Sequence, residues 1–195
     1  MSLTSPPAIK AELLKIAESA PASDYVVPGV FAPQRRAELV RDIQTFLHGT
    51  VLLHLSTLGP TGWPVTHCMH FASMVGADQS LVIYMFTQDN TRKLVNIQAN
   101  PRVSLALFRP AAGSPPEKTP YLRMNALATV ITDEDERTMV FDTMRAKPGF
   151  DFAKKLRLED QPLLRADVLL AIWEDPANDV PAGTLDVSAG LRPRA

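Results

Sequence analysis

The sequence has a single cysteine, Cys68, among 195 residues. One cysteine excludes an intrachain disulfide and any zinc or iron–sulfur site built from several cysteines, and its scarcity favours a reducing compartment. No apolar run approaches the roughly 18 residues of a membrane-spanning helix. The first ten residues, MSLTSPPAIK, lack the basic and then apolar pattern of a signal peptide. We therefore expect a cytoplasmic protein.

The chain also lacks a charge excess of either sign. Its 20 basic and 21 acidic residues leave a formal net charge of −1, and no block of like charges stands out. This balance argues against a general nucleic-acid binder and against a protein that binds anionic membranes. The length and the 46 % hydrophobic content are typical of one globular domain with a sizeable core.

Strand patterns dominate the middle of the chain. Between Val51 and Gln88 the only charged residue in the sequence is Asp78, and Val, Leu, Thr, Phe and Tyr are frequent. Short glycine turns divide this stretch into three strands, which favours an antiparallel meander. The expected strands are 51–57, 63–72, 80–87, 102–108, 121–131 and 166–174.

Helical patterns flank and interrupt these strands. We expect an N-terminal helix at 8–19, a helix from Pro33 to Leu47, a short helix from Thr91 to Ala99, and an acidic helix capped by Thr132. Strands and helices do not alternate regularly, so a Rossmann sheet is disfavoured. The sequence predicts a mainly β fold, a small barrel of six strands with peripheral helices.

The segment 88–102, QDNTRKLVNIQANPR, carries the clearest chemical signal. With Thr91 or Asn90 as N-cap, Arg92 and Lys93 fall in the first helical turn, where cations oppose the helix dipole. Two cations beside the unpaired N–H groups of a helix N-terminus are suited to bind a phosphate, although both side chains could simply extend into water. A local anion site in a nearly neutral chain favours a phosphorylated small molecule as ligand.

In their order, these elements resemble the pyridoxamine 5′-phosphate oxidase-like FMN-binding split barrels. The resemblance covers about residues 35–174 and rests on Gly62-Trp63-Pro64, the strand ending at Thr87, the helix 91–99 closed by Asn100-Pro101, and strand 103–108. It implies a six-stranded antiparallel Greek-key split barrel that forms a homodimer. It also implies that FMN binds in each of two clefts between the subunits.

The resemblance assigns roles to residues at matching positions. Arg92 and Lys93 match the pair that holds the flavin phosphate, Thr91 and Thr87 match residues beside the cofactor, and His67 stands where many members have a phosphate-binding arginine. The flavin ring would be lined by Val65, Thr66, His67, Cys68 and Met69. The basic and aromatic motif that binds the vitamin substrate is missing from 175–195, so pyridoxamine phosphate is not the expected substrate.

Three segments follow from this assignment. Residues 1–32 form an N-terminal helix and linker, residues 33–174 the FMN-binding split-barrel domain, and residues 175–195 a C-terminal tail. The function indicated is an FMN-dependent oxidoreductase that acts on an unidentified small molecule, with no nucleic-acid or membrane partner. A deazaflavin-dependent reductase and a flavin- or haem-binding protein without turnover remain alternatives.

The positions of the histidines and of the cysteine suggest further functional interpretations. All four histidines, His48, His54, His67 and His70, lie close together in sequence, which raises the possibility of a metal or haem site. However, His67 and His70 would face opposite sides of a regular strand, and so would His67 and Cys68. We therefore assign no metal site and expect Cys68 to be a packing residue rather than a nucleophile.

Overall fold

The structure is a computed structural model that describes residues 33–76, 79–110, 113, 115–150, 160–178 and 180–186. For 33–36 and 180–186 it describes the backbone alone. The helix expected at 8–19 lies outside the described residues. The described elements are α2 (Pro33–His48), β1 (Leu52–Leu58), β2 (Pro64–Val75), β3 (Leu81–Phe86), α3 (Arg92–Ala99), β4 (Arg102–Phe108), η1 (Pro116–Lys118), β5 (Tyr121–Val130), α4 (Glu134–Ala146), β6 (Leu163–Asp175), η4 (Pro176–Asn178) and β7 (Val180–Asp186).

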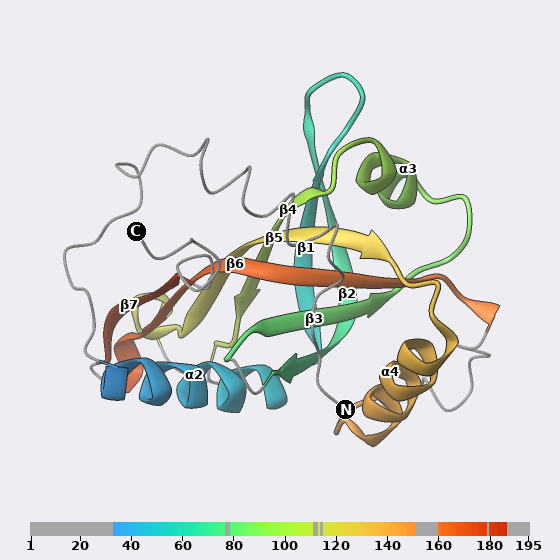
Figure 1. The fold of residues 1–195 in the computed structure, drawn as a ribbon. Coiled ribbons are helices and arrows are strands. Elements are labelled where there is room, and N and C mark those ends of the chain that lie inside the picture. Colours follow the sequence, from blue (N-terminus) through green and yellow to red (C-terminus); the bar gives the residue numbers. More distant parts are fainter. Residues whose placement is uncertain are drawn as a thin grey trace, which may run out of the picture.

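The first six strands form a closed antiparallel barrel (Figure 1). Their order is β3-β2-β1-β4-β5-β6, and β3 pairs with β6 to close the ring. Strands β1 to β3 form the expected meander, and β4 returns to pair with β1, which is a Greek-key arrangement. The prediction of a six-stranded Greek-key barrel is confirmed.

Strand β7 adds to this barrel at one edge. Strand β6 is longer than predicted: Leu163–Asp175 instead of 166–174. Its first half pairs with β3 and its second half, from Leu170 onward, pairs with β7. This seventh strand lies within the segment that the sequence assigns to the tail. Its residues, VPAGTLD, contain Pro and Gly and carry little strand signal, because the free edge of β6 and not intrinsic preference makes the segment a strand.

Alternating side chains fill the barrel. Leu53 and Leu55 of β1 and Leu105 and Leu107 of β4 are fully buried, whereas their neighbours in sequence face outward. Strand β3 is the exception, because it is covered on both faces: Leu81, Ile83 and Met85 belong to the barrel core, and Val82 and Tyr84 to a second core under α4.

Helices α2 and α3 close the barrel core. Helix α2 contributes Ile43, Phe46 and Leu47, and the ring centroid of Phe46 lies 4.5 Å from that of Trp173. Helix α3 contributes Leu94 and Ile97. The two helices lie at different ends of the barrel in Figure 1. Of the helices in the described part of the chain, none has the length and apolar character needed to cross a membrane.

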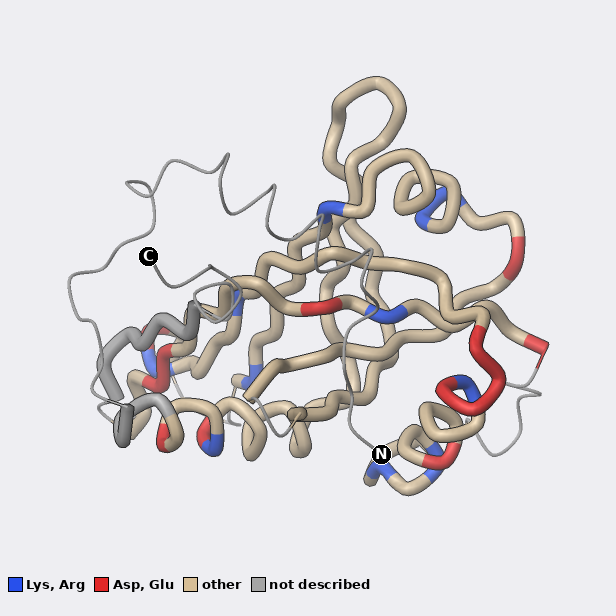
Figure 2. Tube along the Cα trace, viewed as in Figure 1, with Lys and Arg blue, Asp and Glu red and all other residues tan. Residues whose placement is uncertain are grey.

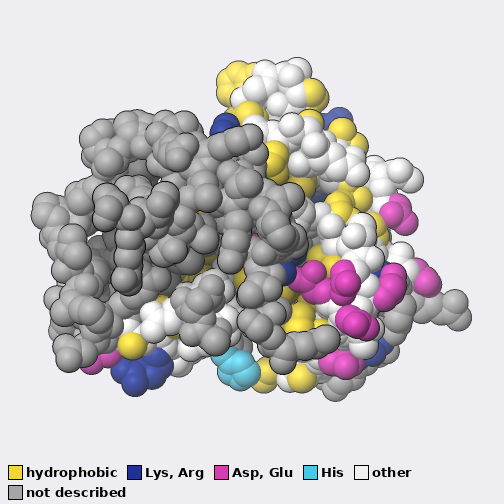
Figure 3. All heavy atoms as spheres, viewed as in Figure 1, with side chains coloured by type: hydrophobic (Ala, Val, Ile, Leu, Met, Phe, Trp, Pro, Cys, Tyr) yellow, Lys and Arg dark blue, Asp and Glu magenta, His cyan; other side chains and the backbone are white. Residues whose placement is uncertain are grey.

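Helix α4 begins one residue later than predicted. Asp133, not Thr132, is the N-cap, and its side chain accepts a hydrogen bond from the backbone N–H of Glu136 at 2.8 Å. A carboxylate caps this helix better than a hydroxyl does, because its negative charge also interacts favourably with the positive end of the helix dipole. Acidic residues gather along this part of the chain (Figure 2), and their side chains form a patch on the surface (Figure 3).

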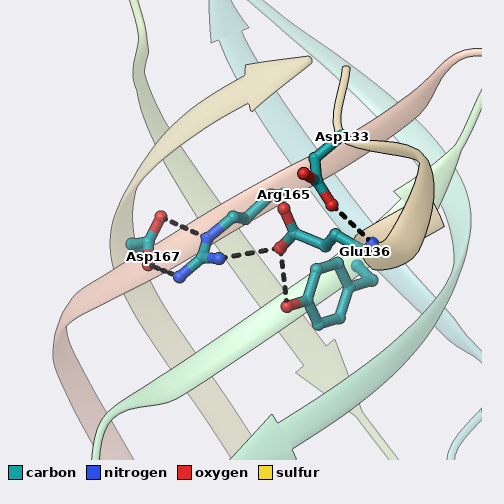
Figure 4. A network of polar contacts seen from close by, with 5 residues as sticks. Asp133, Glu136, Arg165 and Asp167 are labelled. Carbon is teal, nitrogen blue, oxygen red and sulfur yellow. Dashed lines mark hydrogen bonds and ion pairs between the residues drawn. The ribbon is translucent and has the colours of Figure 1, made fainter. Parts of the chain in front are cut away.

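A buried polar network fastens α4 to the barrel (Figure 4). The guanidinium of Arg165, 4 % exposed, donates two hydrogen bonds to the carboxylate of Asp167 at 2.9 and 2.7 Å. It also donates to Oε1 of Glu136 at 2.7 Å, and the Tyr84 hydroxyl donates to the same oxygen at 3.1 Å. Burial and the neighbouring Glu136 raise the pKa of Tyr84, which therefore stays a donor. The sequence analysis did not identify this network, because its members come from three separate elements, β3, α4 and β6.

Lys147 provides a second contact between α4 and the barrel. Its ammonium donates to the carbonyl oxygen of Phe71 at 3.0 Å and lies 3.5 Å from the centre of the Phe71 ring. The residue is buried, and this burial lowers the pKa of Lys147 to about 7. The charged amine is therefore costly to the folded state at neutral pH.

Replacing Arg165 with Met should destabilise the fold strongly, because Asp167 and Glu136 would lose their cation in a buried setting. We expect the free energy of unfolding in urea to fall by about 3–5 kcal/mol. The matched control is Arg145→Met. It removes an exposed arginine of α4 that lies 3.9 Å from Asp142 of that helix, and it should lower the free energy of unfolding by less than about 1 kcal/mol. Equal losses of unfolding free energy in the two variants would show that the Arg165 network stabilises the fold no more than an exposed ion pair does.

Replacing Lys147 with Met should change how stability depends on pH. Between the folded pKa of about 7 and the ordinary value of 10.5, the native amine is neutral while the unfolded one still binds a proton. Wild-type stability therefore rises with pH in this window, and the variant lacks that rise. In urea unfolding at about pH 6 and about pH 9, the stability of the wild type relative to the variant should be greater at the higher pH. A constant difference would contradict the lowered pKa.

Candidate functional site

Helix α3 begins at Arg92, where the sequence predicts a phosphate site. The chain leaves β3 at Thr87, turns through Asn90 in a left-handed conformation with φ of 55°, and enters the helix at Arg92. Asparagine tolerates this conformation better than most residues. Thr91 is the N-cap, and its side chain makes no capping hydrogen bond. The N-terminal amides of the helix thus have no side-chain acceptor from their own cap.

Two cations stand at this helix start, as Figure 2 shows. Arg92 is exposed and Lys93 is half-buried. None of the described residues in the first turn is acidic, so nothing there offsets their unfavourable interaction with the helix dipole. Burial lowers the pKa of Lys93. An anion placed at this helix start would be stabilised by both side chains and by the dipole.

Hydroxyl groups and one buried amide hold the helix start in place. The hydroxyl oxygens of Thr87 and Thr91 lie 3.3 Å apart, and Thr87 is buried. The side-chain amide of Asn96 donates to the hydroxyl of Thr57 on β1 at 2.9 Å, and both residues are buried. This bond fixes α3 over the barrel. The sequence analysis missed Asn96, since a polar residue inside a short helix gives no sign of the partner it will find.

Strand β2 divides its predicted ligands between two faces. His67 and Met69 are paired with Leu55 and Leu53 of β1, whose side chains fill the barrel. Val65, His67 and Met69 therefore face inward, and Met69 is part of the core. Thr66 and Cys68 face outward, where the Thr66 hydroxyl lies 2.9 Å from that of Ser56 and Cys68 is exposed opposite His54.

His67 lies on the same side of β2 as the barrel core, close to α3. Its Nε2 atom is buried and has no hydrogen-bond partner among the described residues. Burial, together with the positive charge of Lys93, lowers the pKa of His67. The imidazole is therefore neutral at neutral pH and available to a ligand.

The other histidines do not join this site. His70 faces the opposite side of β2 and packs against Phe86 and Phe150, with ring centroids 6.1 and 5.3 Å away. His54 packs against Phe108 at 6.4 Å on the outer face. Within the described ranges, no three His, Cys, Asp or Glu side chains are grouped so that they could hold a metal ion.

The structure thus joins five of the predicted residues and separates others. Thr87, Thr91, Arg92, Lys93 and His67 surround the start of α3, whereas Thr66 and Cys68 point away from it. A shallow pocket of about 110 Å³ lies on the outer face of the sheet, lined by Ser104, Arg123, Met124, Asn125, Leu170 and Ile172. Its lining includes none of the predicted residues.

Solved structures share this fold. A protein from Clostridium acetobutylicum related to general stress protein 26 has a TM-score of 0.57 at 13 % identity, covering 80 % of this chain and 98 % of that one. A haem-binding protein from Mycobacterium smegmatis has a TM-score of 0.59 at 18 % identity, with coverages of 86 % and 62 %. HutZ, the haem storage protein of Vibrio cholerae, has 0.51 at 19 %, with coverages of 66 % and 88 %. These identities establish the fold alone.

Sequence comparison gives the family. No curated protein matches the chain significantly. The family model described as pyridoxamine 5′-phosphate oxidase matches residues 39–170, which run from α2 into β6 and include every residue around the start of α3. The order of strands and the position of α3 agree with the resemblance that the sequence itself carries. The chain therefore belongs to the pyridoxamine 5′-phosphate oxidase family.

Proposed function

We propose that this protein is an FMN-binding oxidoreductase that acts on a small molecule. One observation carries the proposal: at the start of α3, two cations, two threonine hydroxyls and a buried imidazole nitrogen lie together without an acidic residue in the first turn of that described helix. In a chain of the pyridoxamine 5′-phosphate oxidase family, this arrangement fits the phosphate of a flavin.

The residues present fit such a phosphate by their chemistry. The guanidinium of Arg92 and the ammonium of Lys93 would hold it by charge-assisted hydrogen bonds. The Thr87 and Thr91 hydroxyls and the first amides of α3 supply neutral donors. The buried Nε2 of His67, which has no partner in the described structure, gains one when an anion binds. Val65 and the β2 backbone would meet the ring.

The protein's contribution to the reaction is positioning. Bound FMN supplies the hydride-transfer chemistry. Arg92, Lys93 and His67 fix the phosphate end, and α3 itself is held by the Asn96–Thr57 hydrogen bond. Thr66 and Cys68 face away from these residues, so we assign no role to the Cys68 thiol. The substrate would reach the ring through the cleft that a second chain completes.

A second copy of the chain is the partner that the outer face suits. Among the described residues, large apolar side chains are exposed at Leu52 and Leu58 of β1 and at Phe108 of β4, the last being 55 % exposed. The register of β1 and β4 brings Leu52 and Phe108 together next to His54, where they form a small apolar surface, whereas Leu58 lies at the other end of β1. Burying such a surface in a homodimer removes it from water.

A haem-binding protein without turnover is the second candidate. Two proteins of the same fold are named for binding or storing haem, and the exposed His54 imidazole beside Phe108 would suit a flat apolar ligand. The mass and visible spectrum of the ligand extracted from purified protein distinguish FMN, a deazaflavin and haem. Recovery of haem in stoichiometric amount, with no flavin, would reject our assignment.

The homodimer should dissociate when its apolar surface is made charged. We expect the wild type to sediment at about twice the chain mass of 21.4 kDa and Phe108→Glu to shift toward monomer, because a buried carboxylate without a partner is costly. Val95→Glu changes an equally exposed residue, 57 % against 55 %, but on α3, and should leave the dimer intact. Monomeric wild-type protein that binds FMN tightly would contradict this assembly.

The phosphate site should respond to loss of Arg92. A charge-assisted hydrogen bond contributes roughly 1.5–3 kcal/mol, so Arg92→Ala should weaken FMN binding at least about tenfold. Riboflavin, which lacks the phosphate, should bind wild type weakly and lose little further. The matched control is Arg102→Ala, an exposed arginine at the start of β4.

Stability without ligand gives an independent check on that variant. It should stay unchanged or rise slightly in Arg92→Ala, since an unfavourable cation leaves a helix N-terminus. Fluorescence titration with both ligands measures the binding, and equal losses for FMN and riboflavin would show that Arg92 has a structural role instead.

A further inference from the structure

One side chain of this site can change its charge near neutral pH. His67 reaches the start of α3 from β2, and its Nε2 atom is buried with no hydrogen-bond partner in the described structure. An unsatisfied buried polar atom costs about 1–3 kcal/mol. Native proteins keep few such atoms, and one beside a proposed ligand site indicates an interaction that the ligand completes.

The surroundings of His67 hold it neutral while the site is free. Burial is the larger cause and the charge of Lys93 the second, and both lower its pKa. On β1 the residue paired with His67 is Leu55, an apolar core residue. On α3 the charged group that acts on His67 is Lys93, and no described carboxylate contributes to the shift. The free site thus lacks the counterion that would keep an imidazolium in place.

A phosphate dianion would reverse this balance. It brings up to two negative charges next to Lys93 and His67, which offsets the repulsion from Lys93 and gives buried Nε2–H an acceptor. Opposite charge nearby favours the protonated form of a histidine. Because binding and protonation share one site, each must strengthen the other by the same factor.

We propose that His67 is a proton-linked phosphate ligand, which is neutral in the free site and takes up one proton from solvent when the phosphate of the cofactor binds. The inference rests on the proposed function, and it adds a regulatory property to that site. The proton ends on the imidazole ring, so that both ring nitrogens carry hydrogen and Nε2–H donates to a phosphate oxygen. Retention of the cofactor would then weaken as the pH rises.

Calorimetry tests this coupling directly. FMN binding to the purified full chain is measured near pH 7.5 in two buffers of different ionisation enthalpy, and the difference gives the number of protons taken up. We expect a clear fraction of one proton per site for wild type. Affinity should rise by up to about tenfold per pH unit as the pH falls from about 8 toward 6.5, above the second phosphate pKa of about 6.

Three variants locate the proton. His67→Gln keeps a polar side chain that does not titrate, so proton uptake should vanish and the affinity should vary little with pH. His67→Arg carries a permanent charge, and we expect tight binding without proton uptake. His48→Gln changes an exposed histidine at the end of α2 and should behave as wild type. Riboflavin should show no proton uptake with any variant.

The outcomes separate this inference from the proposed function. FMN binding by wild type without proton uptake would overturn the inference and leave the FMN assignment standing. Uptake that persists in His67→Gln would also overturn it, since another group such as Lys93 would then titrate. Failure of every folded variant, including His67→Arg, to bind FMN would instead reject the proposed function.

Discussion

Pairing of β3 with β6 is the contact on which the rest of the structure depends, because it turns an open sheet into a barrel. Closing the ring places β3 between two layers, and its six residues are covered on both sides by the barrel core and by α4. A strand buried on both faces requires that the helix packed over it be held in a fixed position. The Arg165 network and Lys147 provide it, since both join α4 to neighbouring strands through directed hydrogen bonds.

The same closure positions the candidate site. Strand β3 ends at Phe86, and the chain must cross the barrel end to reach β4. Helix α3 therefore lies over that end, with Leu94 and Ile97 in the core. The inner surface of α3 therefore packs against the barrel, and Asn96 donates a hydrogen bond to Thr57. The N-terminus of α3 lies beside β2, and His67 is the inward-facing residue of β2 that joins the candidate site. Topology, rather than local sequence, brings these segments together.

Periodicity and turn residues were sufficient to predict the strands of the barrel, α3 and α4, because each carries a local signal that packing then reinforces. The first turn of α3, with Arg92 and Lys93, was found for the same reason. Features that depend on distant partners were not found in this way. In the sequence Arg165 and Asp167 look like ordinary strand residues, and only the fold shows that Glu136 of another element contacts Arg165. Likewise β7 exists because β6 extends past β3 and offers an edge, a fact that no local pattern contains.

Stability and binding oppose each other at the start of α3. Two cations next to a helix N-terminus, a half-buried lysine and a buried imidazole nitrogen without a partner each cost the free chain something. Helix α4 shows the opposite arrangement at its start: Asp133 is its N-cap and Glu134 and Asp135 follow, which are the charges that its dipole favours. The contrast between two helices of one small barrel supports the proposal that the start of α3 binds a ligand. An anion of high charge density satisfies all of these groups at once, whereas a neutral molecule would satisfy none of the charges.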